Sequence, residues 1–272
     1  MLERASSALH GSERLGPRRR QLRRRGLIMF IILLAIVCIA TIYGLWQSSV
    51  RISNVLVYGE DPSLITYAKT ALQGSYFGII PHDSTFFFPA SRIRASILEA
   101  HSNIAAVSIF RNGLTGISIK PDERVSVAKW CGFSPTEGVE EYCYVFDAGG
   151  YIFAPATTTT KTINTFTLYA PLEDDTLEAL RATIAHANTI PQVFDFARQL
   201  DTQGSPVTKV IIRGDEVDDY LASGTRVTYI LGDEEKAFTA LVSAHENLNL
   251  ADGSVEYVDL RFDGKVYLKR KE

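Results

Sequence analysis

The sequence predicts an α+β protein in which a single transmembrane helix is followed by two folded domains. Two observations lead to this prediction. A long apolar run without charges lies near the N-terminus, and the strands and helices predicted after it are mixed, without the regular alternation of a parallel α/β sheet. The length of 272 residues is sufficient for two domains of ordinary size.

The apolar run covers residues 27–45, which include no charged side chain. At about 1.5 Å per residue, a helix of this length spans the roughly 30 Å hydrocarbon layer of a bilayer. Tyr43 and Trp46 at its far end suit the membrane interface, so we place the transmembrane helix at 27–46. The run is longer than the apolar core of a signal peptide, and no small-residue cleavage site follows it. We therefore expect an uncleaved anchor.

The charge distribution predicts the orientation of this anchor. Residues 1–26 carry eight arginines against two glutamates, whereas the whole chain has a net charge of −3. The positive-inside rule keeps such a basic tail in the cytoplasm and places the C-terminal domains outside it. An arginine tail can also bind nucleic acid, but the acidic remainder of the chain argues against a nucleic-acid partner.

The first predicted domain, 51–121, has the element order β-α-α-β-β. Asn112-Gly113 predicts a hairpin turn between its last two strands. The apolar loop 77–89 between the helices is expected to pack on its own domain, because large exposed apolar patches are uncommon. The expected elements are a strand over 50–57, helices over 63–74 and 91–101, and strands over 103–113 and 114–124.

The second predicted domain, 122–270, is a mixed β-domain. Its helices are expected over 174–190, 191–204 and 233–248, and its strands over 142–155 (a hairpin), 166–171, 207–214 and 225–232. The chain then ends in two alternating runs, Val255–Phe262 and Lys265–Lys269, on either side of Asp263-Gly264. An Asp-Gly pair in this setting predicts a two-residue type I′ hairpin. The last strand of this hairpin would have one open edge, which proteins normally cover or blunt.

The cysteines and histidines are the residues of this sequence that could form a disulfide or hold a metal. Cys131 and Cys143 are a candidate disulfide that would contribute about 2–3 kcal/mol in an oxidising compartment, and two reduced buried thiols are the alternative. The sequence has five histidines, but none has the spacing of a metal-binding helix, and there is no nucleophile elbow, phosphate loop or dinucleotide motif. We therefore expect no enzyme activity, no metal, no cofactor and no small-molecule substrate.

Several stretches in a fixed order resemble one family. The basic tail, single span, β-α-α-β-β domain and mixed β-domain resemble the bacterial cell division proteins FtsQ/DivIB, and the β-α-α-β-β domain is similar to their POTRA domain. The matching stretches are "ISNVLVYG", "IAAVSIFR", "ISIKPDERVSVAKW", "VFDAGGYIF", "RVTYILGDEEKAFTAL" and "YVDLRFDGKVYLK". The insertion "CGFSPTEGVEEYC" and the threonine-rich loop depart from the family pattern, as does "HSNI", where the family often has proline.

The resemblance implies a non-enzymatic, single-pass scaffold of the divisome at the division septum of the plasma or inner membrane, which supports septum formation. It implies FtsB/FtsL-type partners, among other divisome components, and strand addition by the FtsB-like partner beside the last strand. The partner-binding residues it implies are Arg261, Phe262, Lys265, Val266, Tyr267, Leu268 and Lys269.

Three alternatives stay open. The terminal strand can be an ordinary edge that lysines protect from self-association. The chain can be a membrane-anchored POTRA-containing secretion or assembly factor, although the sequence has one POTRA-like unit and no barrel-like strand series. A cell-wall hydrolase is disfavoured by the missing catalytic motifs.

Overall fold

The structure, a computed structural model, describes residues 15–59, 61–135, 142–174, 178–244 and 248–271. The chain divides into two compact units. The first contains residues 1–99 and 107–121, and the second contains residues 100–106 and 122–272. Residues 100–106 thus group with the second unit, whereas the sequence predicts them in the first domain. The predicted α+β class is confirmed.

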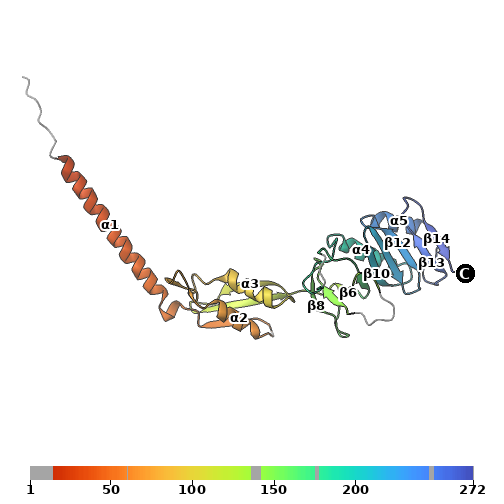
Figure 1. Ribbon diagram of the computed structural model, residues 1–272, viewed down its shortest axis with the longest axis horizontal. Coiled ribbons are helices and arrows are strands. Elements are labelled where there is room, and N and C mark those ends of the chain that lie inside the picture. The colour runs from red at the N-terminus through yellow and green to blue at the C-terminus, as the bar shows by residue number, and fades with distance from the viewer. Residues whose placement is uncertain (1–14, 60, 136–141, 175–177, 245–247, 272) are drawn as a thin grey trace, which may run out of the picture. The chain divides into compact units, whose positions relative to one another are not determined.

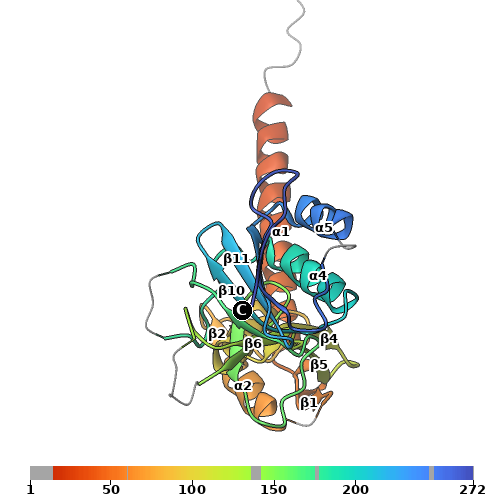
Figure 2. The ribbon, with the colours of Figure 1, turned by 90° about the vertical axis from the view of Figure 1, so that its right-hand side faces the viewer.

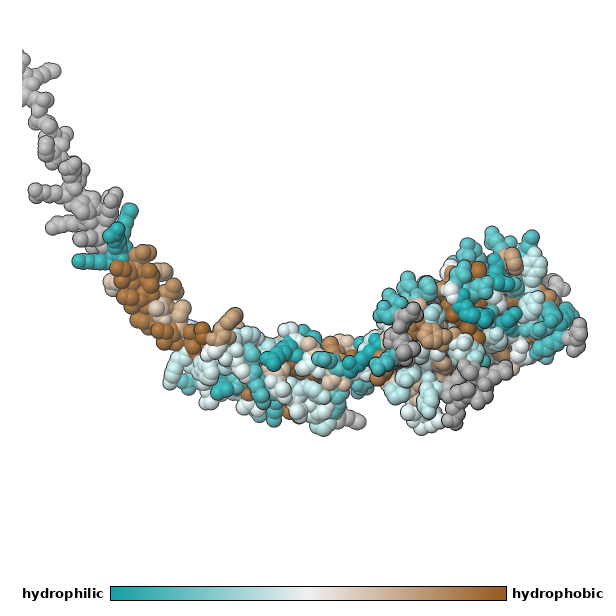
Figure 3. Space-filling model, in the orientation of Figure 1, coloured by the Kyte–Doolittle hydropathy of each residue, from teal (hydrophilic) through white to brown (hydrophobic). Residues whose placement is uncertain are grey.

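The N-terminal helix α1 extends from Leu15 to Leu45 (Figure 1). Within the described residues it is the one helix that is long and apolar enough to cross a membrane, over Arg23–Leu45. Figure 3 shows its strongly apolar surface in brown. The helix begins well before residue 27, because arginine favours helical backbone and the basic segment therefore continues the apolar helix.

The first unit has the predicted order of two helices between its first and its last two strands. These elements are β1 (Asn54–Val57), α2 (Ser63–Ala71), α3 (Ala90–Ala100), β4 (Ile104–Arg111) and β5 (Gly116–Glu123). The three strands form a sheet in the order β1-β5-β4, with β1 parallel to β5. Two short strands, β2 (Ser75–Tyr76) and β3 (Ile80–Pro81), add a small hairpin at the start of the apolar loop.

The second unit is built on a nine-stranded sheet with the order β14-β13-β12-β11-β10-β9-β6-β7-β8. Helices α4 (Ile190–Asp201) and α5 (Glu234–Ser243) lie on the same side of β10 and β11 in Figure 2. The strands are β6 (Ala128–Trp130), β7 (Tyr144–Phe146), β8 (Ile152–Pro155), β9 (Thr167–Tyr169), β10 (Val207–Arg213), β11 (Glu216–Leu221), β12 (Arg226–Ile230), β13 (Val255–Asp259) and β14 (Tyr267–Arg270).

The main core of the second unit lies between this sheet and the two helices. Phe196 of α4 packs on Tyr229 of β12 with ring centroids 4.2 Å apart, and both side chains are fully buried. Alternate residues of the central strands, such as Val210 and Ile212 of β10, point into this core. The intervening residue, Ile211, points to the other face of the sheet, as the two-residue period of a strand requires.

The predicted helix over 174–190 is wrong for the residues that the structure describes, 178–189. They form turns and two isolated bridges, in which Thr183 pairs with Tyr151 and Ile184 pairs with Leu172. Thr183 and Ile184 are β-branched and lose side-chain freedom in a helix. The extended pairing buries Ile184 completely, and this tertiary gain outweighs the weak local preference for helix.

Strand β11 was absent from the predictions because its sequence, "EVDDYL", contains three acidic residues. Acidic residues are rare in strands, so the local sequence gives little strand signal. The structure compensates one of these charges directly: the Asp218 carboxylate accepts hydrogen bonds from Arg213 and from the Thr228 hydroxyl. The neighbouring strands thus make the acidic segment a central strand of the sheet.

Cys131 and Cys143 form a disulfide on the sheet face opposite the helices, where Tyr169 and Ile211 pack around it. The bond joins positions 12 residues apart and restricts the unfolded chain. We expect that replacing both cysteines by serine lowers the free energy of unfolding of the second unit by about 2–3 kcal/mol. Urea unfolding followed by the fluorescence of buried Trp130 would measure this. The Cys38→Ser variant is the control and should unfold like the parent protein.

Candidate functional site

The terminal hairpin pairs β13 with β14, but its register differs from the prediction. Val258 lies opposite Leu268, and Asp259 lies opposite Tyr267. A two-residue turn at Asp263-Gly264 would place Val258 opposite Lys269, so the observed pairing is shifted by one residue. The last strand therefore begins at Tyr267, and Lys265 and Val266 belong to the connecting loop.

The turn itself explains this shift. Lys265 N–H donates to Phe262 C=O (3.0 Å), and Gly264 has a φ of +64°. Asp263, however, is not among the described residues with positive φ. A type I′ turn requires positive φ at both central residues, so the predicted turn type is wrong. The Asp-Gly pair still reverses the chain, but within a longer loop.

The outer edge of β14 is open in the described part of the chain, because β14 ends the sheet and has β13 as its one neighbour. The directions of its backbone groups follow from the bond in which Lys271 N–H donates to Ser254 C=O (2.8 Å) on the β13 side. Amides alternate in direction along a strand, so those of Tyr267 and Lys269 also point toward β13.

The amides of Leu268 and Arg270 consequently point to the open side. The other side of β13 agrees with this assignment, since Leu260 N–H donates to Thr228 C=O (2.8 Å) of the neighbouring strand β12. Two outward N–H groups, with the carbonyl groups of the same residues, thus form a short ladder without a partner strand. Such a ladder can accept an extended peptide by main-chain hydrogen bonding.

The side chains of β14 are all exposed, and its charged groups are basic. Tyr267 is stacked edge-to-face on the exposed ring of Phe262, with centroids 5.2 Å apart. The Lys269 ammonium contacts the Glu256 carboxylate at 2.7 Å, and this contact raises the pKa of Lys269. Arg270 follows it on the strand. Like charges oppose pairing of this edge with a second copy and favour an acidic segment.

Arg261 is engaged within its own domain rather than displayed at the edge. Its guanidinium binds both carboxylate oxygens of Asp259 (Nε to Oδ1 3.0 Å, Nη2 to Oδ2 2.6 Å) and also binds Glu216 of β11. The hydrogen bond from Arg261 lowers the pKa of Asp259, despite partial burial that acts in the opposite direction. Arg261 therefore ties the start of the loop to β11 and holds the hairpin in place.

Removing this tie should have a pH-dependent effect. The lowered pKa of Asp259 gives stability that is complete above about pH 4, the ordinary range of the group, and is lost as pH falls through the folded-state value. We expect Arg261→Ala to cost about 1 kcal/mol at pH 7, discounted because the side chain is one-third exposed, and less at pH 3. Urea unfolding at both pH values measures this. An equal loss at both would contradict the role. Arg261→Lys should lower the free energy of unfolding at pH 7 nearly as much as Arg261→Ala, since lysine lacks the planar guanidinium that binds both carboxylate oxygens.

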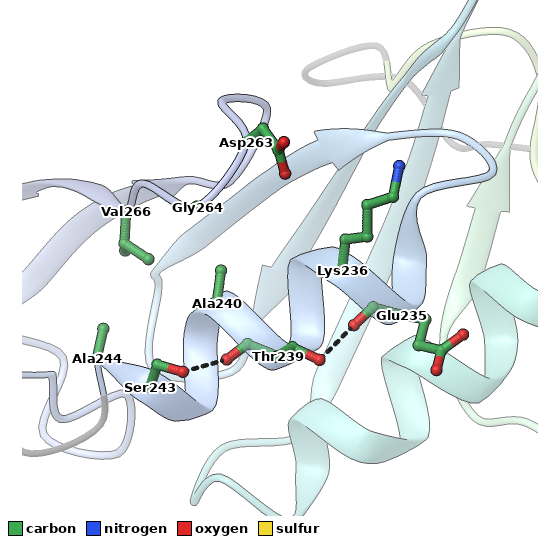
Figure 4. Close-up of a pocket in the computed structure, with 9 residues that line it drawn as sticks. All are labelled: Glu235, Lys236, Thr239, Ala240, Ser243, Ala244, Asp263, Gly264 and Val266. Carbon is green, nitrogen blue, oxygen red and sulfur yellow. Dashed lines mark hydrogen bonds between the residues drawn. The ribbon is translucent and has the colours of Figure 1, made fainter.

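A groove of about 650 Å³ lies between α5 and the loop before β14. Figure 4 shows Ala240, Ala244 and Val266 on its walls, and the hydroxyls of Thr239 and Ser243 turned to carbonyls of their own helix. The groove thus offers methyl groups between a few charged side chains. Its full lining is Glu235, Lys236, Thr239, Ala240, Ser243, Ala244, Asp263, Gly264 and Val266.

The structure brings most of the predicted partner-binding residues together at one end of the sheet. Tyr267, Leu268 and Lys269 lie on the edge strand, and the others lie in or beside its connecting loop. The groove wall on α5 was not predicted, because no local pattern indicates which helix face meets a distant loop. Of the helix predicted over 233–248, residues 245–247 lie outside the described part of the chain.

Among the described residues, no group of three or more His, Cys, Asp or Glu side chains is placed to hold a metal ion. No protein-family model matches the sequence, and no curated protein matches it.

Proposed function

We propose that this protein is a non-enzymatic, single-pass scaffold of the bacterial divisome, similar to FtsQ/DivIB, whose first domain is of the POTRA type. In this proposal α1 anchors the protein in the plasma or inner membrane with its N-terminus in the cytoplasm. The domains outside the cytoplasm bind FtsB/FtsL-type partners at the septum and support septum formation.

The observation that carries the proposal is the open edge of β14. Outward amides at Leu268 and Arg270 are available for main-chain pairing, and basic side chains disfavour a second copy of the same strand. Strand addition uses such an edge, with main-chain bonds giving affinity and alternate side chains giving specificity. The six family-like stretches, in order along the chain, and the β-α-α-β-β order of the first unit support the same assignment.

Localisation and complex formation test the proposal together. A fluorescent fusion of the full chain, expressed at its native level, should concentrate at mid-cell in dividing cells. The full chain in detergent should also co-purify with the FtsB-like protein of the same cell. A uniform membrane signal together with no co-purification would overturn the division role and favour the assembly-factor alternative.

A further inference from the structure

Six exposed apolar side chains gather around the point where the chain leaves α1. The loop 77–89 was expected to pack its apolar groups on its own domain, but several of them are exposed. Phe77 is 98% exposed, and its neighbours are about half exposed. We call the set the apolar collar, and it consists of Trp46, Phe77, Ile79, Phe86, Phe87 and Leu114.

One side of the apolar collar is bonded directly to the end of α1. Trp46 follows the last helical residue, Leu45, and its indole Nε1–H donates to Ile79 C=O (2.8 Å). The hairpin that carries Ile79 is also held to the chain just after the helix. The Arg51 guanidinium donates hydrogen bonds to both carboxylate oxygens of Asp83, which follows the hairpin by two residues. If α1 spans the membrane, Trp46 lies at interface depth, and Ile79 lies there with it.

The tip of this hairpin presents an aromatic side chain at a sterically unfavourable position. Ile79 N–H donates to Tyr76 C=O (3.0 Å), and both residues between them have positive φ, +52° at Phe77 and +73° at Gly78. These are the features of a type I′ turn, in which asparagine, aspartate or glycine is usual at the first central position. Phenylalanine there gains almost no burial from its own domain. Its exposure and its backbone strain both point to a contact outside the domain.

The other side of the apolar collar is held near the same exit point. The Thr85 hydroxyl bonds to the carbonyls of Val50 (3.1 Å) and Leu114 (2.5 Å). Phe86, next to Thr85, lies under the Arg111 guanidinium at 5.5 Å from its ring centre. The two separate loops that carry these exposed apolar groups therefore meet near Val50, a few residues beyond the end of α1.

We propose that the apolar collar inserts into the outer interfacial layer of the membrane that α1 spans, and so holds the first unit against the lipid surface. This inference rests on the proposed function, because it requires α1 to be a membrane anchor. Aromatic and aliphatic side chains partition to the boundary between headgroups and acyl chains. Arg111 above Phe86 would lie among the phosphates, so an anionic lipid surface fits best.

A lipid surface fits the apolar collar better than a peptide does. The collar is formed by two loops and the helix end around one exit point, and its position is continuous with the apolar surface of α1. A bound strand or helix would instead need one continuous edge or groove. Proteins seldom expose apolar patches of this kind without a use for them.

The test places an environment-sensitive fluorophore, NBD, on Phe77→Cys in the full chain carrying Cys38→Ser. The native disulfide leaves no other free thiol among the three cysteines. The protein is reconstituted into phosphatidylglycerol–phosphatidylethanolamine vesicles. We expect a blue-shifted emission and about twofold or stronger quenching by lipids that carry a spin label near the headgroup. Leu114→Cys is a second reporter, which keeps the test valid if labelling disturbs the Phe77 turn.

Lys120→Cys is the matched control, because Lys120 is exposed and lies farther along β5 from the turn that carries Leu114. Its label should stay water-like in the same vesicles. Water-like emission from both collar reporters, in protein that floats with the vesicles, would show that the apolar collar does not insert into the membrane. The role of α1 as membrane anchor would stand. Shielding of the labels only after the FtsB-like partner is added would also contradict insertion of the apolar collar into the membrane. Protein that fails to float with the vesicles would contradict both the membrane anchor and the insertion of the collar.

Discussion

Leu268→Pro is expected to abolish or strongly weaken binding of the FtsB-like partner by the full chain. The substitution removes an amide that points to the open side of β14, and the proline ring projects into the space that an added strand would occupy. The lost hydrogen bond alone is worth about 1–3 kcal/mol, or roughly 5- to 150-fold in Kd. Titration of the partner against the full chain in nanodiscs would measure this.

Two matched variants separate the amide from the side chain. Leu268→Ala keeps the amide but removes most of the exposed side chain, and it should weaken binding far less. Lys269→Pro removes an amide that points to β13, so it should destabilise the hairpin and lower the melting temperature. If Leu268→Pro stays folded and binds like the parent protein, the β14 edge is not the partner site.

The register of this hairpin illustrates how much the sequence could predict. The alternating runs around Asp263-Gly264 located both strands correctly to within a few residues, because alternation and turn residues are local signals. The one-residue shift depends on φ at Asp263, which the longer loop sets. The shift changes which residue of β13 lies opposite each residue of β14, while the amides of Leu268 and Arg270 face outward in either register. The alternating run alone also includes Lys265 and Val266 in the edge strand, whereas both lie in the loop.

The other differences between the predicted and the observed elements also arise from contacts that are distant in the sequence. The first unit was predicted well, since its helices and strands each carry a clear periodic pattern. The segment 178–189 and the acidic strand β11 were not predicted, because distant partners decide their structure. Arg261 was predicted as a contact residue from the family resemblance, yet its three close hydrogen bonds to Asp259 and one to Glu216 are internal. The pairing with Asp259, two residues away, is a local feature of the sequence, but the contact with Glu216 of β11 depends on the fold.

Asp219→Asn is expected to stabilise the second unit at neutral and alkaline pH. Asp219 of β11 is fully buried on the helix-covered face, close to the Tyr229 hydroxyl, and neither group makes a hydrogen bond of normal geometry. Burial, together with the charges of Asp218 and Glu234, raises the pKa of Asp219 well above its ordinary range. The folded protein must therefore either keep a proton on this carboxyl or bury an unpaired charge.

The direction of the pH dependence follows from this raised pKa. Below about pH 4 the carboxyl is protonated in both the folded and the unfolded protein, and its contribution is complete. As pH rises from there through the folded-state pKa, the unfolded chain releases the proton more readily, and stability falls. Asparagine has no such proton to lose. The gain from Asp219→Asn should thus be small at pH 4 and reach about 1–3 kcal/mol at pH 8.

Asp218→Asn is the control, because the neighbouring aspartate is almost as buried but lies on the opposite face with partners. Its carboxylate accepts from Arg213 and from the Thr228 hydroxyl. Neutralising it should destabilise the unit by about 1 kcal/mol or more, since two charge-assisted bonds become weaker. Two adjacent substitutions of the same kind should therefore have opposite signs at pH 8. Urea unfolding followed by Trp130 fluorescence tests this, and a loss of stability in Asp219→Asn would show that its carboxylate has a compensating partner.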